Sequence, residues 1–160
     1  MTLKQSITPC LWFDGRAEEA AAFYVSIFKN AKINAISRYG DAGPGPKGSA
    51  MTVGFELDGQ SFIALNGGPQ YKFNAAISLI VNCATQDEVD NLWEKLSEGG
   101  QIQQCGWVTD KFGVTWQVVP AGLLEMLSNK DRAKSSRAMQ AMLQQKKLDI
   151  AAIRKAFDGG

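Results

Sequence analysis

The chain has 160 residues, which is the length of one ordinary domain or of two small halves packed together. Hydrophobic residues make up 45% and charged residues 21%, so the chain can bury a core and is not disordered. The balance of 17 Lys and Arg against 16 Asp and Glu indicates neither nucleic acid nor a membrane as partner, and the absence of histidine excludes every site that needs this residue as metal ligand or general base.

The first half predicts a strand, a helix and three further strands. An apolar run ends at the turn signal Asp14-Gly15, and the apolar residues from Ala20 to Ile27 then recur at helical spacing. A Gly- and Pro-rich loop separates the next strand from a hairpin around Asp58-Gly59. The expected strands are residues 7–13, 33–39, 50–57 and 60–66, with the loop at 40–48.

The second half predicts the same order of elements. Thr85 and Glu88 form a capping box at the start of a helix, and Gly99-Gly100 ends it. The helical apolar positions repeat those of the first half at an offset of 69 residues, and the hairpin positions repeat at an offset of 54. This match favours a duplicated βαβββ unit. The expected strands are residues 76–83, 102–105, 107–109 and 114–119.

The composition changes after Pro120. Apolar spacing predicts a helical turn at 123–127 and helices at 131–146 and 148–157, and residues 130–158 carry eight Lys and Arg against three Asp. Such a tail could bind an acidic partner or nucleic acid, but no aromatic residues alternate with its charges, so a solvated outer face of packed helices is favoured. We expect paired βαβββ modules in 1–120, at about 5–69 and 74–120. Residues 121–160 are expected to form a C-terminal helical extension packed on the domain or on a dimer partner.

The cysteines and the first residues of the chain indicate the cellular compartment of the protein. Cys10, Cys83 and Cys105 lie far apart and form no C-x-x-C pair, so neither a disulfide framework nor a zinc site is indicated. The first six residues carry no apolar segment, and no apolar run reaches the roughly 18 residues that a membrane span needs. We therefore expect a cytoplasmic protein with no membrane partner.

Several local motifs together resemble one family. They are TPCLWFDG at 8–15, AEEA at 17–20, FIALNGGP at 62–69, GWVTDKFGVTWQ at 106–117 and RAMQAM at 137–142. In combination they resemble the PhnB-like family, also labelled 3-demethylubiquinone-9 3-methyltransferase-like, of the vicinal oxygen chelate superfamily, which includes glyoxalase I, bleomycin-resistance proteins and extradiol dioxygenases. The resemblance covers nearly the whole chain. It implies an α+β fold in which tandem βαβββ repeats form a cupped mixed sheet, here with a C-terminal helical extension.

The resemblance also implies a metal site in the cup, with ligands from the first strand, the start of the fifth and the middle of the last. These positions fall near residues 8–10, Ala76 and Gln117, and none holds a histidine or a carboxylate. A divalent ion needs several good donors, so we expect no metal ion. This argues against glyoxalase, dioxygenase or thiol-transferase chemistry at the inherited site.

The methyltransferase label is not supported by the residues. A cofactor pocket for methyl transfer commonly uses a Gly-rich turn after the first strand of a parallel α/β sheet. Here the first strand ends in Phe13-Asp14-Gly15-Arg16, without a G-x-G, and the halves are not parallel α/β units. We therefore expect no cofactor.

Alternation along the strands predicts which side chains line the cup. On the first strand either Cys10 and Trp12 or Leu11 and Phe13 face inward, and the spacing leaves this open. Asp110, beside Lys111-Phe112-Gly113, is interpreted as a turn residue. The candidate ligand-binding residues are Cys10, Trp12, Asn66, Ser78, Thr115 and Gln117; no catalytic residue is assigned.

The leading hypothesis is a metal-free protein that binds a small aromatic or amphipathic ligand in the cup. A second hypothesis is an enzyme of the superfamily, for example a lyase or the methyltransferase of the label, with Cys10 as nucleophile or a metal ion elsewhere. A third is an interaction protein that recruits a partner through its basic tail. Short sheets leave edges to cover, so a homodimer is expected.

Overall fold

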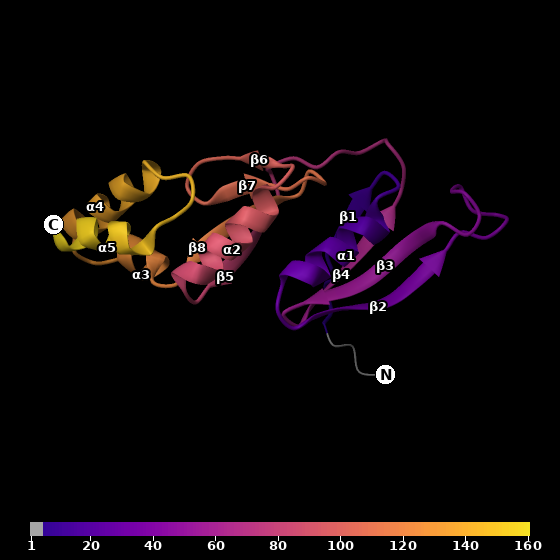
Figure 1. Ribbon diagram of the computed structural model, residues 1–160, viewed down its shortest axis with the longest axis horizontal. Helices are drawn as coiled ribbons and strands as arrows, with labels where there is room; N and C mark the ends of the chain where they lie inside the picture. The colour runs from indigo at the N-terminus through magenta and orange to yellow at the C-terminus, as the bar shows by residue number, and fades with distance from the viewer. Residues whose placement is uncertain (1–4) are drawn as a thin grey trace. The chain divides into compact units, whose positions relative to one another are not determined.

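The structure is a computed structural model that describes residues 5–160, and the expectation of no apolar N-terminal segment falls partly on residues 1–4, outside the described part. The chain divides into two compact units, Met1–Phe73 and Asn74–Gly160 (Figure 1). Each unit contains one four-stranded mixed sheet.

The first unit is a βαβββ module. Its sheet has the order β1-β4-β3-β2, in which β1 runs parallel to β4 and the other neighbours are antiparallel. One face of the sheet is covered by α1 (Figure 1), whose residues Ala17, Ala20, Ala21 and Tyr24 are buried. The elements are β1 (Cys10–Phe13), α1 (Ala17–Ile27), β2 (Ala31–Arg38), β3 (Ala50–Leu57) and β4 (Gln60–Asn66).

Aromatic rings fill the layer between α1 and this sheet. The ring of Tyr24 stacks on Phe55 at a centroid distance of 6.2 Å, and Phe55 stacks on Phe62 at 5.3 Å. All three side chains are buried, and aromatic rings of this size each bury a large apolar area.

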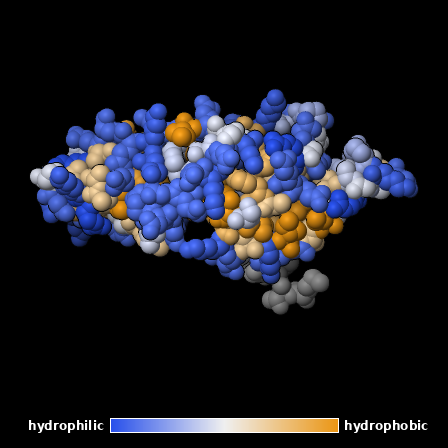
Figure 2. Space-filling model, in the orientation of Figure 1, coloured by the Kyte–Doolittle hydropathy of each residue, from blue (hydrophilic) through white to orange (hydrophobic). Residues whose placement is uncertain are grey.

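At the sheet edge, by contrast, Ile33 and Ile36 of β2 are partly exposed, and Figure 2 shows apolar side chains gathered on the surface of the first unit.

The second unit repeats the module and adds three helices. Its sheet has the order β5-β8-β7-β6, with β5 parallel to β8, so the strands connect as they do in the first unit. The predicted α+β class with tandem βαβββ repeats is confirmed. The elements are β5 (Leu79–Cys83), α2 (Gln86–Ser97), β6 (Gln101–Ile102), β7 (Trp107–Thr109), β8 (Thr115–Pro120), α3 (Leu123–Leu127), α4 (Arg132–Leu143) and α5 (Ile150–Asp158).

The start of α2 shows why the local sequence forms a helix there. Thr85 accepts a hydrogen bond from the backbone N–H of Glu88 at 3.2 Å, as the capping box predicts. The Glu88 carboxylate reaches one residue further back than expected and accepts from the N–H of Ala84 at 2.8 Å. Two N–H groups at the helix start are thus paired.

Three strands are shorter than the sequence predicts, and each has a local cause. The first begins at Cys10 rather than at residue 7, because Pro9 has no N–H to add to the ladder. The fifth begins at Leu79 rather than at residue 76, because the side chain of Asn74 accepts from the N–H of Ala76 at 2.8 Å and holds a turn. The sixth ends at Ile102, well before the left-handed backbone at Cys105 and Gly106.

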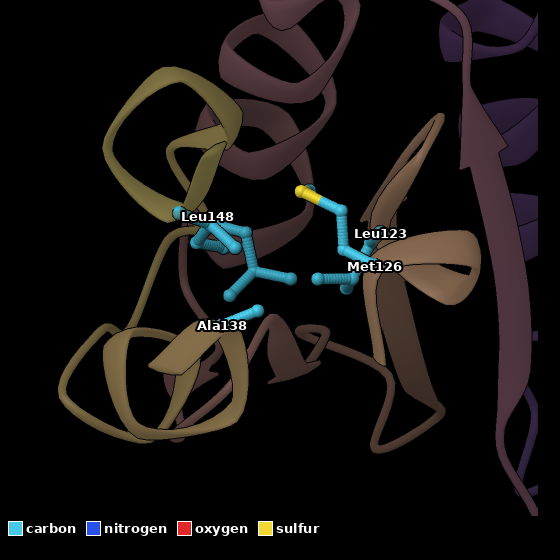
Figure 3. Packing of buried hydrophobic residues seen from close by; sticks show 5 residues of the cluster. Leu123, Met126, Ala138 and Leu148 are labelled. Carbon is cyan, nitrogen blue, oxygen red and sulfur yellow. The ribbon is translucent and has the colours of Figure 1, made fainter. Parts of the chain in front are cut away.

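The C-terminal helices pack around a small apolar cluster of their own. Leu148, between α4 and α5, is 1% exposed and lies against Leu123 and Met126 of α3 and Ala138 of α4 (Figure 3). Asp131 and Asp149 cap α4 and α5 by accepting from backbone N–H groups of their first turns. Within the described residues, no helix is long and apolar enough to cross a membrane.

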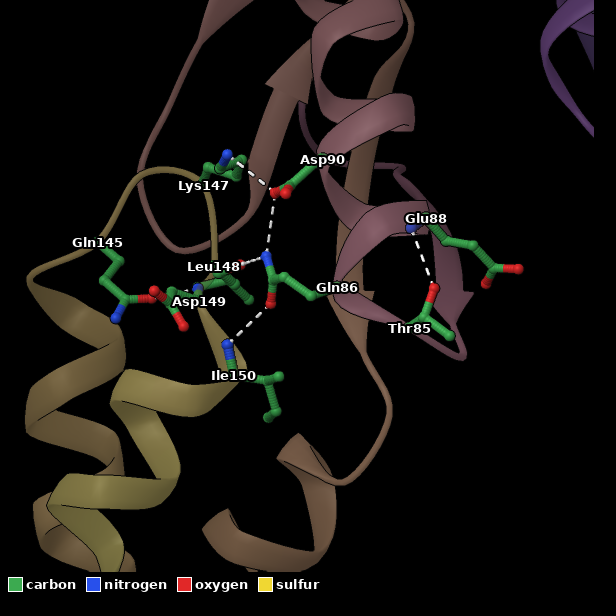
Figure 4. Close-up of polar contacts among 9 residues, drawn as sticks. All are labelled: Thr85, Gln86, Glu88, Asp90, Gln145, Lys147, Leu148, Asp149 and Ile150. Carbon is green, nitrogen blue, oxygen red and sulfur yellow. Dashed lines mark hydrogen bonds and ion pairs between the residues drawn. The ribbon is translucent and has the colours of Figure 1, made fainter.

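One glutamine of α2 ties this extension to the second module (Figure 4). The side chain of Gln86 donates to the carbonyl oxygen of Leu148 at 2.9 Å and accepts from the N–H of Ile150 at 3.0 Å. Beside it, Lys147 forms an ion pair with Asp90 at 2.8 Å. The basic extension thus packs on its own unit, and one of its lysines pairs there rather than with an external partner.

Candidate functional site

The face of each sheet that its helix leaves uncovered is the candidate functional site. In the first unit, Leu11 lies beside Ala64, which is fully buried under α1, whereas Cys10 lies beside Ile63, which is 36% exposed. Since neighbouring partners in a sheet share a face, Cys10 and Trp12 point to the open face. Of the two alternatives for the first strand, the structure has Cys10 and Trp12 on the uncovered side and Leu11 and Phe13 toward the helix.

Trp12 has a structural role on this face, where it contacts the segment that follows β4. Its indole N–H donates to the carbonyl oxygen of Gly68 at 2.9 Å, and its ring meets the edge of Tyr71 at a centroid distance of 5.0 Å. A Cβ on Gly67 would lie 2.3 Å from the Trp12 ring, so only glycine allows the chain to pass this close. Trp12 therefore holds the segment that follows β4 against the open face.

Cys10 is exposed on the open face, but its environment does not activate the thiol. Partial burial raises the pKa of Cys10 above the ordinary value for cysteine. A nucleophilic cysteine needs the opposite shift, usually from a nearby cation or a helix N-terminus. The neutral thiol offers apolar contact rather than a ready nucleophile.

Asn66 lies on the other side of the first sheet. Its position pairs with Phe13 on the face that α1 covers, and its side-chain oxygen accepts from the N–H of Ala17 at 2.9 Å. Its side-chain nitrogen donates to the carbonyl oxygen of Ala50 at 2.9 Å. The amide thus caps the start of α1, and the structure does not bring Asn66 to the open face that carries Cys10 and Trp12.

The open face of the second sheet carries the three remaining predicted residues. Gln117 of β8 donates from its side chain to the Ser78 hydroxyl at 2.9 Å. Ile80 of β5 and Trp107 of β7 are the direct neighbours of Gln117, and Ile80 is 57% exposed. A polar pair thus lies beside apolar side chains on a surface that α2 leaves uncovered.

Thr115 belongs to a polar ladder on the same face, although it is only 2% exposed. Its hydroxyl lies 3.3 Å from that of Thr109, which in turn accepts from the side chain of Gln103 at 2.6 Å. Sequence reasoning missed Gln103 and Thr109. The pairing of Thr109 with Thr115 could have been found, because both residues lie close to the turn at Asp110 and so face each other across the hairpin.

Asp110 is confirmed as a turn residue. Its side chain accepts from the N–H groups of Phe112 at 2.8 Å and Val114 at 3.1 Å, and from the indole N–H of Trp116 at 2.8 Å. The carboxylate is 3% exposed and is used to close the β7–β8 turn.

The donors present do not fit the divalent ion that the superfamily implies. Cys10 carries a thiol with a raised pKa, Gln117 carries a neutral amide, and Ala76 carries no donor atom. Within residues 5–160, no group of three or more His, Cys, Asp or Glu side chains is placed to hold a metal ion. A hard cation loses its hydration shell only to several charged or strongly polar ligands, and this set does not supply them.

Comparisons with known proteins agree on the family. The model of the 3-demethylubiquinone-9 3-methyltransferase family matches residues 5–119. The solved PhnB protein of Bacillus cereus is 39% identical with a TM-score of 0.69, over 73% of this chain and 100% of that one. Protein PA1353 of Pseudomonas aeruginosa is 26% identical with a TM-score of 0.62, over 72% and 97%.

A more distant structure shares the fold alone. FosX, a fosfomycin resistance protein of Listeria monocytogenes solved with Mn(II) and sulfate, is 17% identical with a TM-score of 0.56, over 79% of this chain and 100% of that one. A search of the curated proteins finds no match.

Proposed function

This chain belongs to the 3-demethylubiquinone-9 3-methyltransferase family, and we propose that it binds a small aromatic or amphipathic molecule on the open faces of its sheets without a metal ion. Its PhnB-like membership and its glyoxalase/bleomycin-resistance type of fold supply the framework. Within that framework the side chains on the open faces determine what can bind. These side chains are either apolar, or polar and uncharged.

The open face of the second sheet carries this proposal. Ile80 is 57% exposed and lies beside Gln117, whose side chain is held in place by its bond to Ser78. A largely apolar surface with a few fixed polar groups is what most small-molecule sites offer. A ligand with a flat apolar body could cover Ile80 and Trp107 while its polar end contacts the amide of Gln117.

The methyl transfer in the family's name finds little support in the residues. The turn after β1 holds one glycine, Gly15, and the N–H of Ala17 just beyond it is already taken by the Asn66 side chain. Both sheets are mixed rather than parallel. The residues therefore do not fit the Gly-rich cofactor turn of a parallel α/β methyltransferase, and binding is favoured over transfer.

A charge at Ile80 is expected to weaken ligand binding. The probe is anilinonaphthalene sulfonate, an aromatic anion that fluoresces on apolar surfaces. Ile80→Asp removes apolar contact area and places a carboxylate on the open face, so the affinity should fall about tenfold. Fluorescence titration at equal protein concentration measures this.

Leu124→Asp is the matched control. Leu124 is 74% exposed on α3, in the same unit but outside the sheet, so this variant should bind the probe as wild type does. Equal losses in both variants, or no loss in Ile80→Asp, would show that the probe binds elsewhere and would count against the proposed site.

A further inference from the structure

The first unit has a cavity that does not belong to the open face of its sheet. It measures about 550 Å³ and lies between the start of α1, the Gly- and Pro-rich loop at 40–48 and the end of β4. This volume falls within the range of small-molecule sites, roughly 300–1,000 Å³. The cavity is on the helix side of the sheet, where Asn66 points, and not on the open face with Cys10.

The loop wall of the cavity is held in one shape by Tyr39. A Cβ on Gly43 would lie 2.6 Å from the Tyr39 ring and one on Gly45 would lie 2.3 Å from it, so both glycines let the loop close around the ring. The Tyr39 hydroxyl donates to the backbone oxygen of Asn66 at 2.6 Å. The backbone of Tyr39 also pairs with Gly48 and Ser49 on the far side of the loop.

The side chain of Asn66 fixes the other walls. Its bonds to the N–H of Ala17 and to the carbonyl oxygen of Ala50, both 2.9 Å long, join the start of α1 to the start of β3. The loop, the helix and the strand are thus tied to one residue. These bonds fix the walls of the cavity within the unit itself, which keeps the cost of ordering the site small.

The charges around the cavity are unequal. Arg38 forms a two-pronged ion pair with Glu18, at 3.2 and 3.3 Å, so these two charges offset each other. Asp14 also lines the cavity, and within residues 5–160 its carboxylate has no hydrogen-bond or ion-pair partner. One carboxylate at the rim is therefore available to a ligand, next to an apolar wall of Tyr39, Pro44 and Pro46.

From this geometry we infer that the cavity binds a small organic amine. Its ammonium group pairs with Asp14, and its apolar body lies against the ring of Tyr39 and the two prolines. The ammonium gains a charge-assisted hydrogen bond to the carboxylate, and the apolar body gains from leaving water. This site is separate from the proposed binding on the open faces, so either proposal can fail without the other.

The test compares two probes of similar size and opposite charge. Phenylethylamine and phenylacetate are titrated separately into the full-length protein labelled with ¹⁵N, and the amide spectrum is followed. The amine is expected to shift the signals of Gly45, Gly67 and Gly68, which line the cavity, and phenylacetate is not. Higher salt should weaken binding of the amine, because the pair with Asp14 is only partly buried.

Asp14→Asn keeps the size of the side chain and removes its charge. Affinity for the amine should fall about two- to fivefold, as expected for an ion pair near solvent. The matched control is Asp41→Asn, in the Gly- and Pro-rich loop, because Asp41 pairs with Lys47 at 2.8 Å and does not line the cavity. The control should bind the amine as wild type does.

Four results would overturn the inference. The amine could cause no shifts, phenylacetate could bind as well as the amine, or the shifts could map to the open face around Cys10 and Ile63. Unchanged affinity in folded Asp14→Asn would also contradict it. If this variant did not fold, the salt dependence of the wild-type titration would decide, because binding that does not depend on salt contradicts the ion pair.

Discussion

Replacement of Asp110 by alanine is expected to lower the free energy of unfolding by about 3–5 kcal/mol. The carboxylate is 3% exposed and accepts from the indole N–H of Trp116 at 2.8 Å and from the N–H groups of Phe112 and Val114. Alanine leaves these donors unpaired where water has little access. Denaturant unfolding, with the slope checked for two-state behaviour, measures the loss.

The Trp116 bond can be isolated by a double-mutant cycle. Trp116→Phe removes the indole donor, so Asp110→Asn, whose side-chain nitrogen would face that donor, should cost less in this background than in the wild type. Asp158→Ala, at the exposed end of α5, is the control and should change stability by less than about 0.5 kcal/mol. A loss below about 1 kcal/mol for Asp110→Ala would show that the turn does not depend on this carboxylate.

Leu148→Ala is expected to cost about 3 kcal/mol, within the range for a buried leucine. Leu148 is 1% exposed in the cluster of the C-terminal helices, and a Cβ on Gly106 would lie 2.9 Å from its Cδ1 atom. The residue is therefore packed from two sides, and alanine leaves a cavity that rigid neighbours cannot fill. Thermal and denaturant unfolding measure the effect.

The control for this variant is Leu143→Ala, because Leu143 at the end of α4 is 51% exposed. It should cost less than about 0.5 kcal/mol. Hydrogen exchange adds a local measure: in Leu148→Ala the amides of α5 should exchange faster while those of α1 stay protected. Similar losses in both leucine variants would contradict the packing of the extension on the second unit.

Much of the fold could be predicted because local signals and the duplicated pattern agree. The capping residues Thr85 and Glu88 and the Asp58-Gly59 hairpin are short-range features whose geometry depends on neighbouring residues. Asp110 is of the same kind, since two of its partners lie within four residues of it. Alternation also limited the first strand to two choices, and only the register with β4 could select Cys10 and Trp12.

The candidate site was harder to predict because the orientation of its side chains depends on partners that are distant in the sequence. Asn66 lies near a strand end, where alternation gives no firm direction, and its bond to Ala17 spans 49 residues of sequence. Ala76 was expected in a strand, but Asn74 holds it in a turn. The cavity around Tyr39 forms only when the loop at 40–48 folds back over the Tyr39 ring, and the sequence pattern gives no sign of that contact.

Metal-free binding is tested most directly by titrating anilinonaphthalene sulfonate into protein purified without a histidine tag, before and after dialysis against EDTA, and again after Mn(II) is added. The metal content of each sample is measured by mass spectrometry. We expect less than stoichiometric metal at the start and the same affinity in all three samples, because the donors around Gln117 and Cys10 are neutral. Stoichiometric metal at the start, with binding that EDTA abolishes and Mn(II) restores, would contradict the proposal.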